Sequence, residues 1–168
     1  GLNDIQLEPR QGVAFQPDAT EVLYGGAAGG GKSYLLRVSA IRWAAEVPGL
    51  QIYFFRRTLP DLRDNHLRGP TAFQVLLSAY LSTGHVKYRS VENEFEFWDG
   101  SIIHLCYCDS ENDVEKYRGA EIHVLMVDEL THFTEYQYRF LRSRVRRAGL
   151  TVPDKYKNRL PRIEAASN

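Results

Sequence analysis

The sequence predicts a three-layer α/β/α fold with a mainly parallel central sheet and antiparallel additions. Three observations predict it. Apolar strand-like runs alternate with helix-like segments along the chain. Residues 122–127 are apolar at almost every position, as expected of a central strand buried on both faces. Between residues 86 and 108 the apolar period changes to two, which predicts antiparallel strands.

The composition is that of an ordinary single globular domain. The chain has 168 residues, of which 43% are hydrophobic and 25% are charged. Its 8 Phe, 10 Tyr and 2 Trp supply enough aromatic volume for a core, which argues against disorder. The 21 basic and 21 acidic residues balance, so contact with nucleic acid would need a local patch. No apolar run approaches the roughly 20 residues of a membrane helix and no signal-peptide pattern opens the chain, so we expect no membrane partner.

The chain begins with a polar stretch, residues 1–20, which we expect to be an arm or loop. Residues 21–24 are a short apolar run that ends at two glycines, which predicts a strand running into a glycine loop. A helix is expected after Ser33, and the Pro-Gly pair at 48–49 ends it. Its apolar residues recur at helical spacing: Leu36, Ala40, Trp43 and Ala44. Residues 51–55 predict a second buried strand.

The middle of the chain predicts a helix and a hairpin. The helix is entered through residues 69–71, and one face of it is apolar. That face consists of Phe73, Leu76, Leu77, Tyr80 and Leu81. Farther on, Phe95 and Phe97 alternate with glutamates, and the Asp-Gly pair at 99–100 predicts a two-residue hairpin turn.

The last third predicts a helix, a loop and a strand. Thr134 and Gln137 have the spacing of a capping box, which predicts that a helix starts there. Residues 147–159 are polar and basic and are expected to form a mobile loop. Residues 160–166 predict a last strand. Because the chain stops directly after it, we expect the sequence to be a fragment of a longer protein.

The two cysteines, Cys106 and Cys108, are two positions apart in an apolar run. This spacing does not favour a disulfide, and Cys-x-Cys supplies too few ligands for a metal site. We therefore expect reduced thiols in the core of a cytosolic protein. The even spacing of His66, His85, His104 and His123 is interpreted as coincidence, because their flanking sequences share nothing.

Residues 26–33 carry the most specific chemical signal, because they fit the phosphate-loop pattern G-x-x-x-x-G-K-[ST]. The residues are Gly26, Ala27, Ala28, Gly29, Gly30, Gly31, Lys32 and Ser33. Glycines let backbone N–H groups approach a phosphate closely, and the following helix adds the positive end of its dipole. Lys32 is expected to bridge the β- and γ-phosphates, and Ser33 to bind Mg²⁺. A flexible glycine-rich loop is the alternative interpretation.

Asp128 and Glu129 follow the buried strand and form the expected second motif. An Asp at the carboxyl end of a central strand lies where α/β sheets bind ligands, and it can hold Mg²⁺. Glu129 is expected to act as a general base on water. The alternative is a strand that simply ends in a polar turn. The Asp-Glu pair favours hydrolysis over kinase or GTPase chemistry, and no Asn-Lys-x-Asp guanine signature is present.

In combination, these segments resemble the large terminase subunits of tailed bacteriophages, the ATPase motors that package viral DNA. The resemblance covers nearly the whole chain, and the order of the segments is more specific than the phosphate loop alone. The matching segments are residues 9–11, 25–33, 55–64, the hairpin before 117–119, then 128–129 and 167–168. The family also has a C-terminal nuclease domain with an RNase H-like fold, which these 168 residues lack.

The resemblance implies roles for four further positions. Gln11 resembles the glutamine that reads adenine, with Gln16 as the alternative. Arg118 resembles an arginine finger inserted into a neighbouring subunit, against the simpler interpretation as a surface ion pair. Some relatives have a basic residue where this chain has Ala27 and Ala28, and its absence here favours Arg118 acting in trans. Residues 167–168, Ser167 and Asn168, resemble the start of the coupling motif that senses the γ-phosphate.

Two groups of arginines remain open at this point. The first is the basic run Arg142, Arg144, Arg146 and Arg147. It is either a solvated end of the helix or a contact with DNA phosphates or a neighbouring subunit. The second is Arg56 and Arg57, at the end of the second strand, which either position phosphate or pair with Asp61 and Asp64.

Motifs and resemblance together predict a P-loop ATPase domain over residues 21–168, preceded by an N-terminal arm over residues 1–20. The implied cofactors are ATP and Mg²⁺, and the implied work is translocation of double-stranded DNA into a procapsid. The implied partners are the DNA, a portal ring, a small terminase subunit and further copies of the chain in a ring. The implied location is the cytoplasm of an infected bacterium. The alternatives are another P-loop DNA-dependent ATPase, such as a helicase or recombinase, and a nucleotide-dependent assembly switch.

Overall fold

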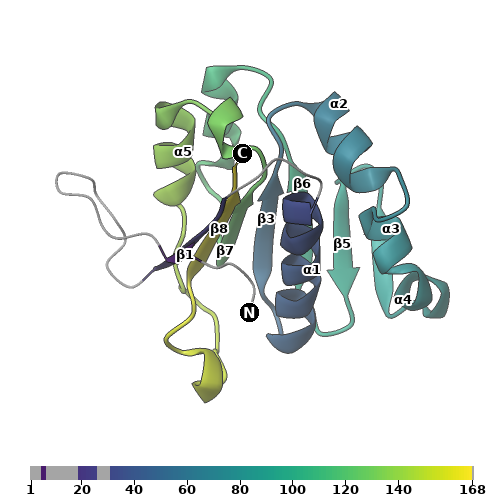
Figure 1. Cartoon of the computed structure of the whole chain (residues 1–168). Helices are drawn as coiled ribbons and strands as arrows, with labels where there is room; N and C mark the ends of the chain where they lie inside the picture. The colour runs from purple at the N-terminus through teal and green to yellow at the C-terminus, as the bar shows by residue number, and fades with distance from the viewer. Residues whose placement is uncertain (1–4, 7–18, 26–30, 168) are drawn as a thin grey trace.

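The computed structural model describes residues 5–6, 19–25 and 31–167. Within these ranges, eight strands form one sheet in the order β1-β2-β8-β7-β3-β6-β5-β4 (Figure 1). The strands are β1 (Ile5–Gln6), β2 (Thr20–Tyr24), β3 (Gln51–Phe55), β4 (Val86–Arg89), β5 (Glu94–Phe97), β6 (Ile102–Cys106), β7 (Val124–Val127) and β8 (Arg162–Ala166). The longer helices are α1 (Gly31–Glu46), α4 (Ser78–Thr83), the 3₁₀ helix η2 (Glu111–Tyr117) and α5 (Glu135–Arg142). Shorter ones are α2 (Leu59–Leu62), the π-helical η1 (Arg63–Leu67), α3 (Phe73–Leu76), η3 (Leu130–His132) and η4 (Asp154–Tyr156).

The centre of the sheet is parallel and its edges are antiparallel, as the sequence predicted. Strands β2, β8, β7, β3 and β6 pair in parallel, whereas β5, β4 and β1 pair antiparallel. The predicted last strand, β8, lies between β2 and β7, so that Glu164 is in register with Val22 on one side and Met126 on the other. The end of the described chain therefore lies in the middle of the sheet.

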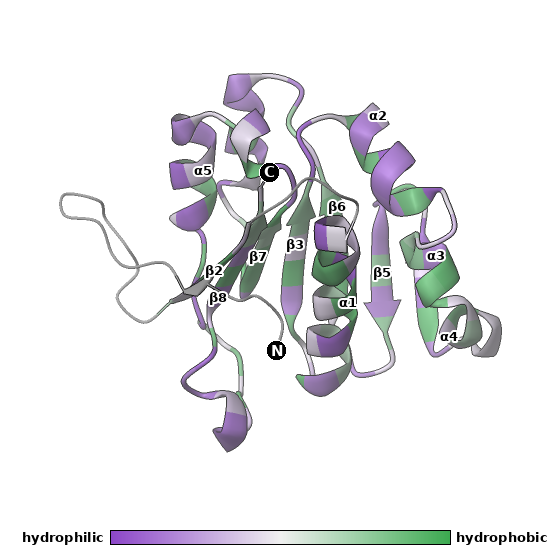
Figure 2. Cartoon of the chain, viewed as in Figure 1, coloured by the Kyte–Doolittle hydropathy of each residue, from purple (hydrophilic) through white to green (hydrophobic). Residues whose placement is uncertain are grey.

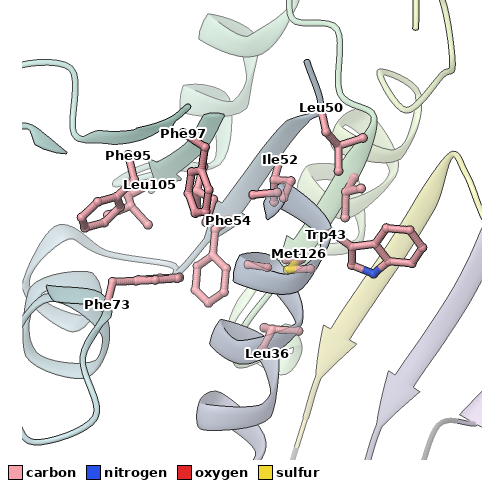
Figure 3. Packing of buried hydrophobic residues seen from close by; sticks show 14 of the residues in the cluster. Leu36, Trp43, Leu50, Ile52, Phe54, Phe73, Phe95, Phe97, Leu105 and Met126 are labelled. Atoms are coloured by element: carbon pink, nitrogen blue, oxygen red, sulfur yellow. The ribbon is translucent and has the colours of Figure 1, made fainter. Parts of the chain in front are cut away.

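The two faces of the sheet bury separate apolar layers, because successive side chains of a strand point to opposite sides. On β3, Ile52 and Phe54 belong to one layer, while Phe55 belongs to the other. Helix α1 and the segment from α2 to α4 cover the first layer, part of which Figure 3 shows around Phe54 and Phe73. Helices η2 and α5 cover the second, through residues such as Leu141. Strand β7 is hydrophobic along its length, while α5 is largely hydrophilic (Figure 2). These are the three predicted layers.

Helix α1 confirms the prediction from apolar spacing. Its buried residues include all four predicted ones: Leu36, Ala40, Trp43 and Ala44. After its last turn, the N–H of Val47 still bonds the carbonyl of Trp43 at 3.1 Å. Gly49 then takes a left-handed φ of +76°, which only glycine adopts without cost. The Pro-Gly pair thus ends the helix and leads directly into β3.

The segment between β3 and β4 differs from its prediction. In place of one helix that carries Phe73 to Leu81, there are two short helices, α3 and α4, separated at Leu77, which has φ −97° and ψ 5°. Phe73 and Leu77 are buried as predicted, whereas Tyr80 is 44% exposed. Helices α2 and η1 were not predicted. Their start is capped by Thr58, whose side chain accepts a hydrogen bond from the N–H of Asp61 at 3.3 Å.

The predicted hairpin turn is in the right place but is one residue longer. The N–H of Phe97 bonds the carbonyl of Ser101 at 2.8 Å, so this pair encloses a loop of three residues, 98–100. Gly100 has a φ of +84°. A three-residue loop with a glycine in this conformation is the common alternative to the two-residue turn.

Further predictions are confirmed at single positions. Helix α5 begins with the predicted capping box of Thr134 and Gln137. Cys106 and Cys108 are free and buried, and burial raises the pKa of both thiols. The predicted loop over 147–159 includes the short helix η4. None of the helices in the described ranges combines the length and apolar character that a membrane crossing requires.

Candidate functional site

Five of the predicted site residues gather at one edge of the sheet. Strands β2, β8, β7 and β3 run in parallel, so their carboxyl ends meet at the edge where the carboxyl end of the chain is marked in Figure 1. Lys32 and Ser33 lie in the first turn of α1, Asp128 and Glu129 follow β7, and Ser167 follows β8. This is the edge at which open α/β sheets bind ligands.

Several predicted positions lie outside the described residues, and the structure tests none of them. They are Gln11 and its alternative Gln16, the loop residues Gly26, Ala27, Ala28, Gly29 and Gly30, and Asn168. The remaining predicted loop residue, Gly31, is the first residue of α1.

Asp128 is the centre of the site. It is 1% exposed, and its Oδ2 accepts three hydrogen bonds: from Ser33 Oγ at 2.9 Å, Arg56 Nη1 at 3.0 Å and His66 Nε2 at 2.7 Å. Burial by itself would raise the pKa of this carboxyl. The hydrogen bond from His66, the positive charge of Arg56 and the hydrogen bond from the Ser33 hydroxyl together outweigh burial and lower the pKa. Asp128 is therefore an anion at neutral pH.

Lys32 reaches from α1 to the end of β8. Its Nζ donates a hydrogen bond to the backbone carbonyl of Ser167 at 2.6 Å, across 135 positions of sequence. The predicted phosphate-binding lysine and the predicted coupling residue are thus in contact. Together with the positive end of the 16-residue helix α1, the ammonium group makes this edge suitable for an anion such as a phosphate.

Glu129 has an unusual backbone. Its φ of 54° and ψ of 59° lie in the left-handed region, which is costly for a residue other than glycine. Its N–H donates to Asp128 Oδ1 at 3.1 Å, and its carboxylate lies 3.9 Å from Nε2 of His132. The side chain is 19% exposed, so water can reach the carboxylate. Backbone strain of this kind is concentrated at functional sites.

The Asp128 and Ser33 oxygens fit a magnesium ion. Carboxylate and hydroxyl oxygens are ligands that Mg²⁺ accepts, and the ion usually takes only one or two from a protein. Within the described ranges no group of three or more His, Cys, Asp or Glu side chains could hold a metal ion alone. The rest of a magnesium shell would therefore come from water and phosphate oxygens, as it does in nucleotide-binding sites.

Arg118 contacts residues of η2 and α5 and the nearby Arg144. It follows η2, its side chain is 65% exposed, and it pairs with Glu115 at 2.7 Å. Its guanidinium lies 5.2 Å from the ring centre of Phe140, and its carbonyl accepts a bond from Arg144 at 2.8 Å. The ion pair fits the simpler interpretation, and the exposed guanidinium is compatible with an arginine finger. The finger role of Arg118 therefore stays a prediction.

The arginines at the end of α5 make more contacts within the chain than either interpretation of the sequence predicts. Arg142 is only 7% exposed in its side chain and pairs with the buried Glu21 of β2 at 2.8 Å, so the prediction of a solvated helix end is wrong for this residue. Arg146 is about half exposed and pairs with Glu121 at 3.5 Å. Arg147 bonds the carbonyl of Lys157 at 3.4 Å.

Sequence reasoning missed part of the Asp128 cluster. Arg56 was expected to position phosphate or to pair with Asp61 or Asp64, but its partner is Asp128. Arg57 donates to the carbonyl of Cys108. His66 was considered only as one of four evenly spaced histidines and not as a site residue. It lies in a polar stretch without apolar periodicity. The one feature of the sequence that could have indicated a site residue is that this stretch follows the strand over residues 51–55, which ends at the same edge of the sheet as Asp128.

Comparisons with known proteins provide evidence on the family and on the fold. Residues 23–151 match the profile of a family described as terminase large subunit, T4likevirus-type, N-terminal. The structure is similar to that of the large terminase from a thermophilic bacteriophage, with a TM-score of 0.62 and 16% sequence identity. The similarity covers 87% of this chain but 33% of the bacteriophage chain, so these residues span about a third of that protein. No curated protein matches the sequence.

Proposed function

The chain belongs to the family of large terminase subunits of the T4-like-virus type, and from this premise we propose that residues 21–168 are the ATPase domain of a viral DNA-packaging motor. In this proposal the domain hydrolyses Mg·ATP to move double-stranded DNA into a procapsid. In the segment that precedes the glycine loop, Gln11, or alternatively Gln16, reads the adenine base. The motor works in the cytoplasm of the infected bacterium.

The observation that carries the proposal is the 2.9 Å hydrogen bond from Ser33 Oγ to Asp128 Oδ2. It joins the helix that follows the glycine loop to the carboxylate that follows the buried strand. These are the two oxygens through which a nucleotide-bound Mg²⁺ is held in phosphate-loop enzymes. Ser33 and Asp128 would hold the ion, which would supply positive charge to offset that of the phosphates.

The chain's own residues supply the remaining chemistry. The glycine loop, residues 26–31, directs backbone N–H groups at the phosphates, and Lys32 stabilises the charge on their oxygens. Glu129, the one carboxylate of the pair that water can reach, orients the attacking water and accepts its proton. Ser167, which follows β8 and contacts Lys32, responds to the γ-phosphate together with Asn168.

Completion of the site requires a second copy of the chain. Arg118 has an exposed guanidinium, which acts as a finger in a neighbouring subunit's site within a ring. The ring docks on a portal, works with a small terminase subunit and grips DNA jointly. DNA binding by several subunits at once is compatible with the zero net charge of this chain, because several weak contacts in a ring together bind strongly.

The direct test compares wild-type chain with Glu129→Gln, using the exposed Glu135→Gln as a matched control. Glu129→Gln is expected to bind Mg·ATP with wild-type affinity and to lose about 10²-fold or more of its turnover, the scale of a lost general base. Glu135→Gln is expected to match the wild type in both. Wild-type turnover by Glu129→Gln would remove Glu129 from the mechanism and favour a nucleotide switch. Strand separation in place of duplex translocation would favour a helicase.

A further inference from the structure

His66 connects Asp128 to the helix α1. The imidazole is completely buried, and both of its ring nitrogens are engaged. Nδ1 lies 2.9 Å from Nη1 of Arg37, and Nε2 lies 2.7 Å from Oδ2 of Asp128. The second distance is the shortest of the three hydrogen bonds to that oxygen. A chain of contacts therefore runs from α1 through one buried ring to the centre of the site.

The chemistry of the partners fixes the tautomer of the ring. An arginine can only donate hydrogen bonds, so Nδ1 of His66 must accept. The proton of a neutral imidazole is then on Nε2, which donates to the Asp128 carboxylate. A ring whose Nδ1 accepts a hydrogen bond from Arg37 carries no proton there, so it is neutral. The His66–Asp128 contact is thus a directed hydrogen bond with one possible polarity.

Arg37 is itself held in place on three sides. Its Nε bonds the carbonyl of Thr71 at 2.8 Å, its Nη2 bonds the Thr71 hydroxyl at 3.0 Å, and its Nη1 also bonds the carbonyl of Asn65 at 2.8 Å. Arg37 follows Ser33 by four positions, so both lie on the same face of α1. Two consecutive turns of α1 therefore hold Asp128, one directly through Ser33 and one through Arg37 and His66.

We propose that His66 is a positioning residue that orients the Asp128 carboxylate for Mg²⁺, an inference that rests on the proposed function. The imidazole, Ser33 and Arg56 all bond Oδ2, which fixes the carboxylate plane before any ligand arrives. Partners of metal-binding carboxylates commonly act in this way, and losing one costs about 10- to 100-fold in metal affinity. The π-helical geometry of η1, which carries His66, is frequent at functional sites.

Packing alone does not account for a histidine at this position. The ring contacts Phe54 edge-on, with 4.6 Å between centres, and lies 6.4 Å from Phe73. An aromatic or aliphatic side chain would fill the same space without burying polar groups, which are costly unless bonded. An apolar side chain at this position could not donate a hydrogen bond to Asp128, whereas His66 does.

Two amides of different length provide the test. In His66→Gln, the longer amide can accept from Arg37 and still donate to Asp128. In His66→Asn, the amide can accept from Arg37 but is too short to reach Asp128. Mg²⁺ is titrated calorimetrically into each full chain in the presence of a non-hydrolysable ATP analogue. The melting temperature is measured separately without metal or nucleotide.

We expect His66→Asn to raise the Mg²⁺ concentration at half-saturation by about 10- to 100-fold, and His66→Gln to stay within about 3-fold of wild type. Equal half-saturation in wild type and His66→Asn, with only the melting temperature lowered, would overturn the proposal and leave His66 a structural residue. If His66→Asn does not fold, His66→Phe retains the packing against Phe54, and the same shift is expected there. A wild-type chain that binds the analogue independently of Mg²⁺ would overturn the proposed function together with this inference.

Discussion

Ser33 and Asp128 are 95 positions apart in the sequence, and the hydroxyl of one donates to the carboxylate of the other at 2.9 Å. The contact exists because β2 and β7 run in parallel on either side of β8, so the segments that follow them leave the sheet at one edge. Lys32 contacts Ser167 at the same edge. The fold thus brings three separate segments of sequence into one candidate nucleotide site.

Arg118 is expected to act only between subunits. Arg118→Ala should lower ATP turnover of an assembled ring by about 10³-fold or more, because a guanidinium that stabilises the transferring phosphoryl group contributes that much. Mixing Arg118→Ala with Glu129→Gln chains should restore part of the activity, since some sites then combine an intact Glu129 with an intact Arg118. Arg139→Ala, an exposed arginine that also pairs with a glutamate, is the matched control and should retain full activity. Mixed rings that stay inactive would contradict action in trans.

Glu164 is expected to be essential for stability. This fully buried carboxylate of β8 accepts bonds from Tyr24 of β2 at 2.9 Å, from Ser39 of α1 at 2.7 Å and from Arg162 at 2.6 Å. Glu164→Ala leaves the buried Arg162 without its counter-charge and should cost about 3–5 kcal/mol in the free energy of unfolding. Urea denaturation measures this cost, with the exposed Glu135→Ala expected within about 0.5 kcal/mol of wild type. A loss below about 1 kcal/mol would contradict this role.

Stability is expected to fall as the pH drops below about 6.5. Burial lowers the pKa of His66, His104 and His123 in the folded chain, that of His104 to about 4 despite the nearby Glu94 carboxylate. The unfolded chain therefore binds protons near pH 6.5 that the folded chain does not bind until lower pH, so acid favours unfolding. For His104 the loss between pH 6.5 and 4 is up to about 3 kcal/mol.

Melting temperatures measured from pH 7.5 to 4.5 check this prediction. In His104→Gln, the melting temperature should fall less steeply with decreasing pH than in wild type, because the amide does not titrate. The exposed His85→Gln should leave the slope unchanged and serves as the control. If the melting temperature falls with pH equally steeply in wild type and His104→Gln, the pKa of His104 is the same in the folded and unfolded chain, and the prediction is wrong.

The parts of the site that follow from local sequence were predictable. The glycine loop, Lys32 and Ser33 are a contiguous pattern, and Asp128 was recognisable because it ends an apolar run. Ser167 could be placed near them only through the resemblance to terminases, since its contact with Lys32 depends on β8 being inserted beside β2. That order of strands is a property of the whole sheet.

His66 and the Arg56–Asp128 pair could not be predicted for the same reason. Arg56 has acidic residues close to it in sequence, and nothing local indicates that it turns to a carboxylate 72 positions away. Helices α2 and η1 escaped prediction because they are only four and five residues long and have no apolar period. A short polar segment of this kind acquires its geometry from what it packs against.

The most direct measurement of the candidate site is calorimetric titration of Mg·ATP into wild type, Lys32→Ala and Lys87→Ala. Lys87 is an exposed lysine of the edge strand β4, which lies at the far side of the sheet from β2. Wild type and Lys87→Ala are expected to bind with the same affinity, and Lys32→Ala is expected to show no binding, because the ammonium group is the principal charge facing the phosphates. Equal affinity of all three chains would mean that ATP, if it binds, does so somewhere other than the edge formed by Lys32, Ser33 and Asp128.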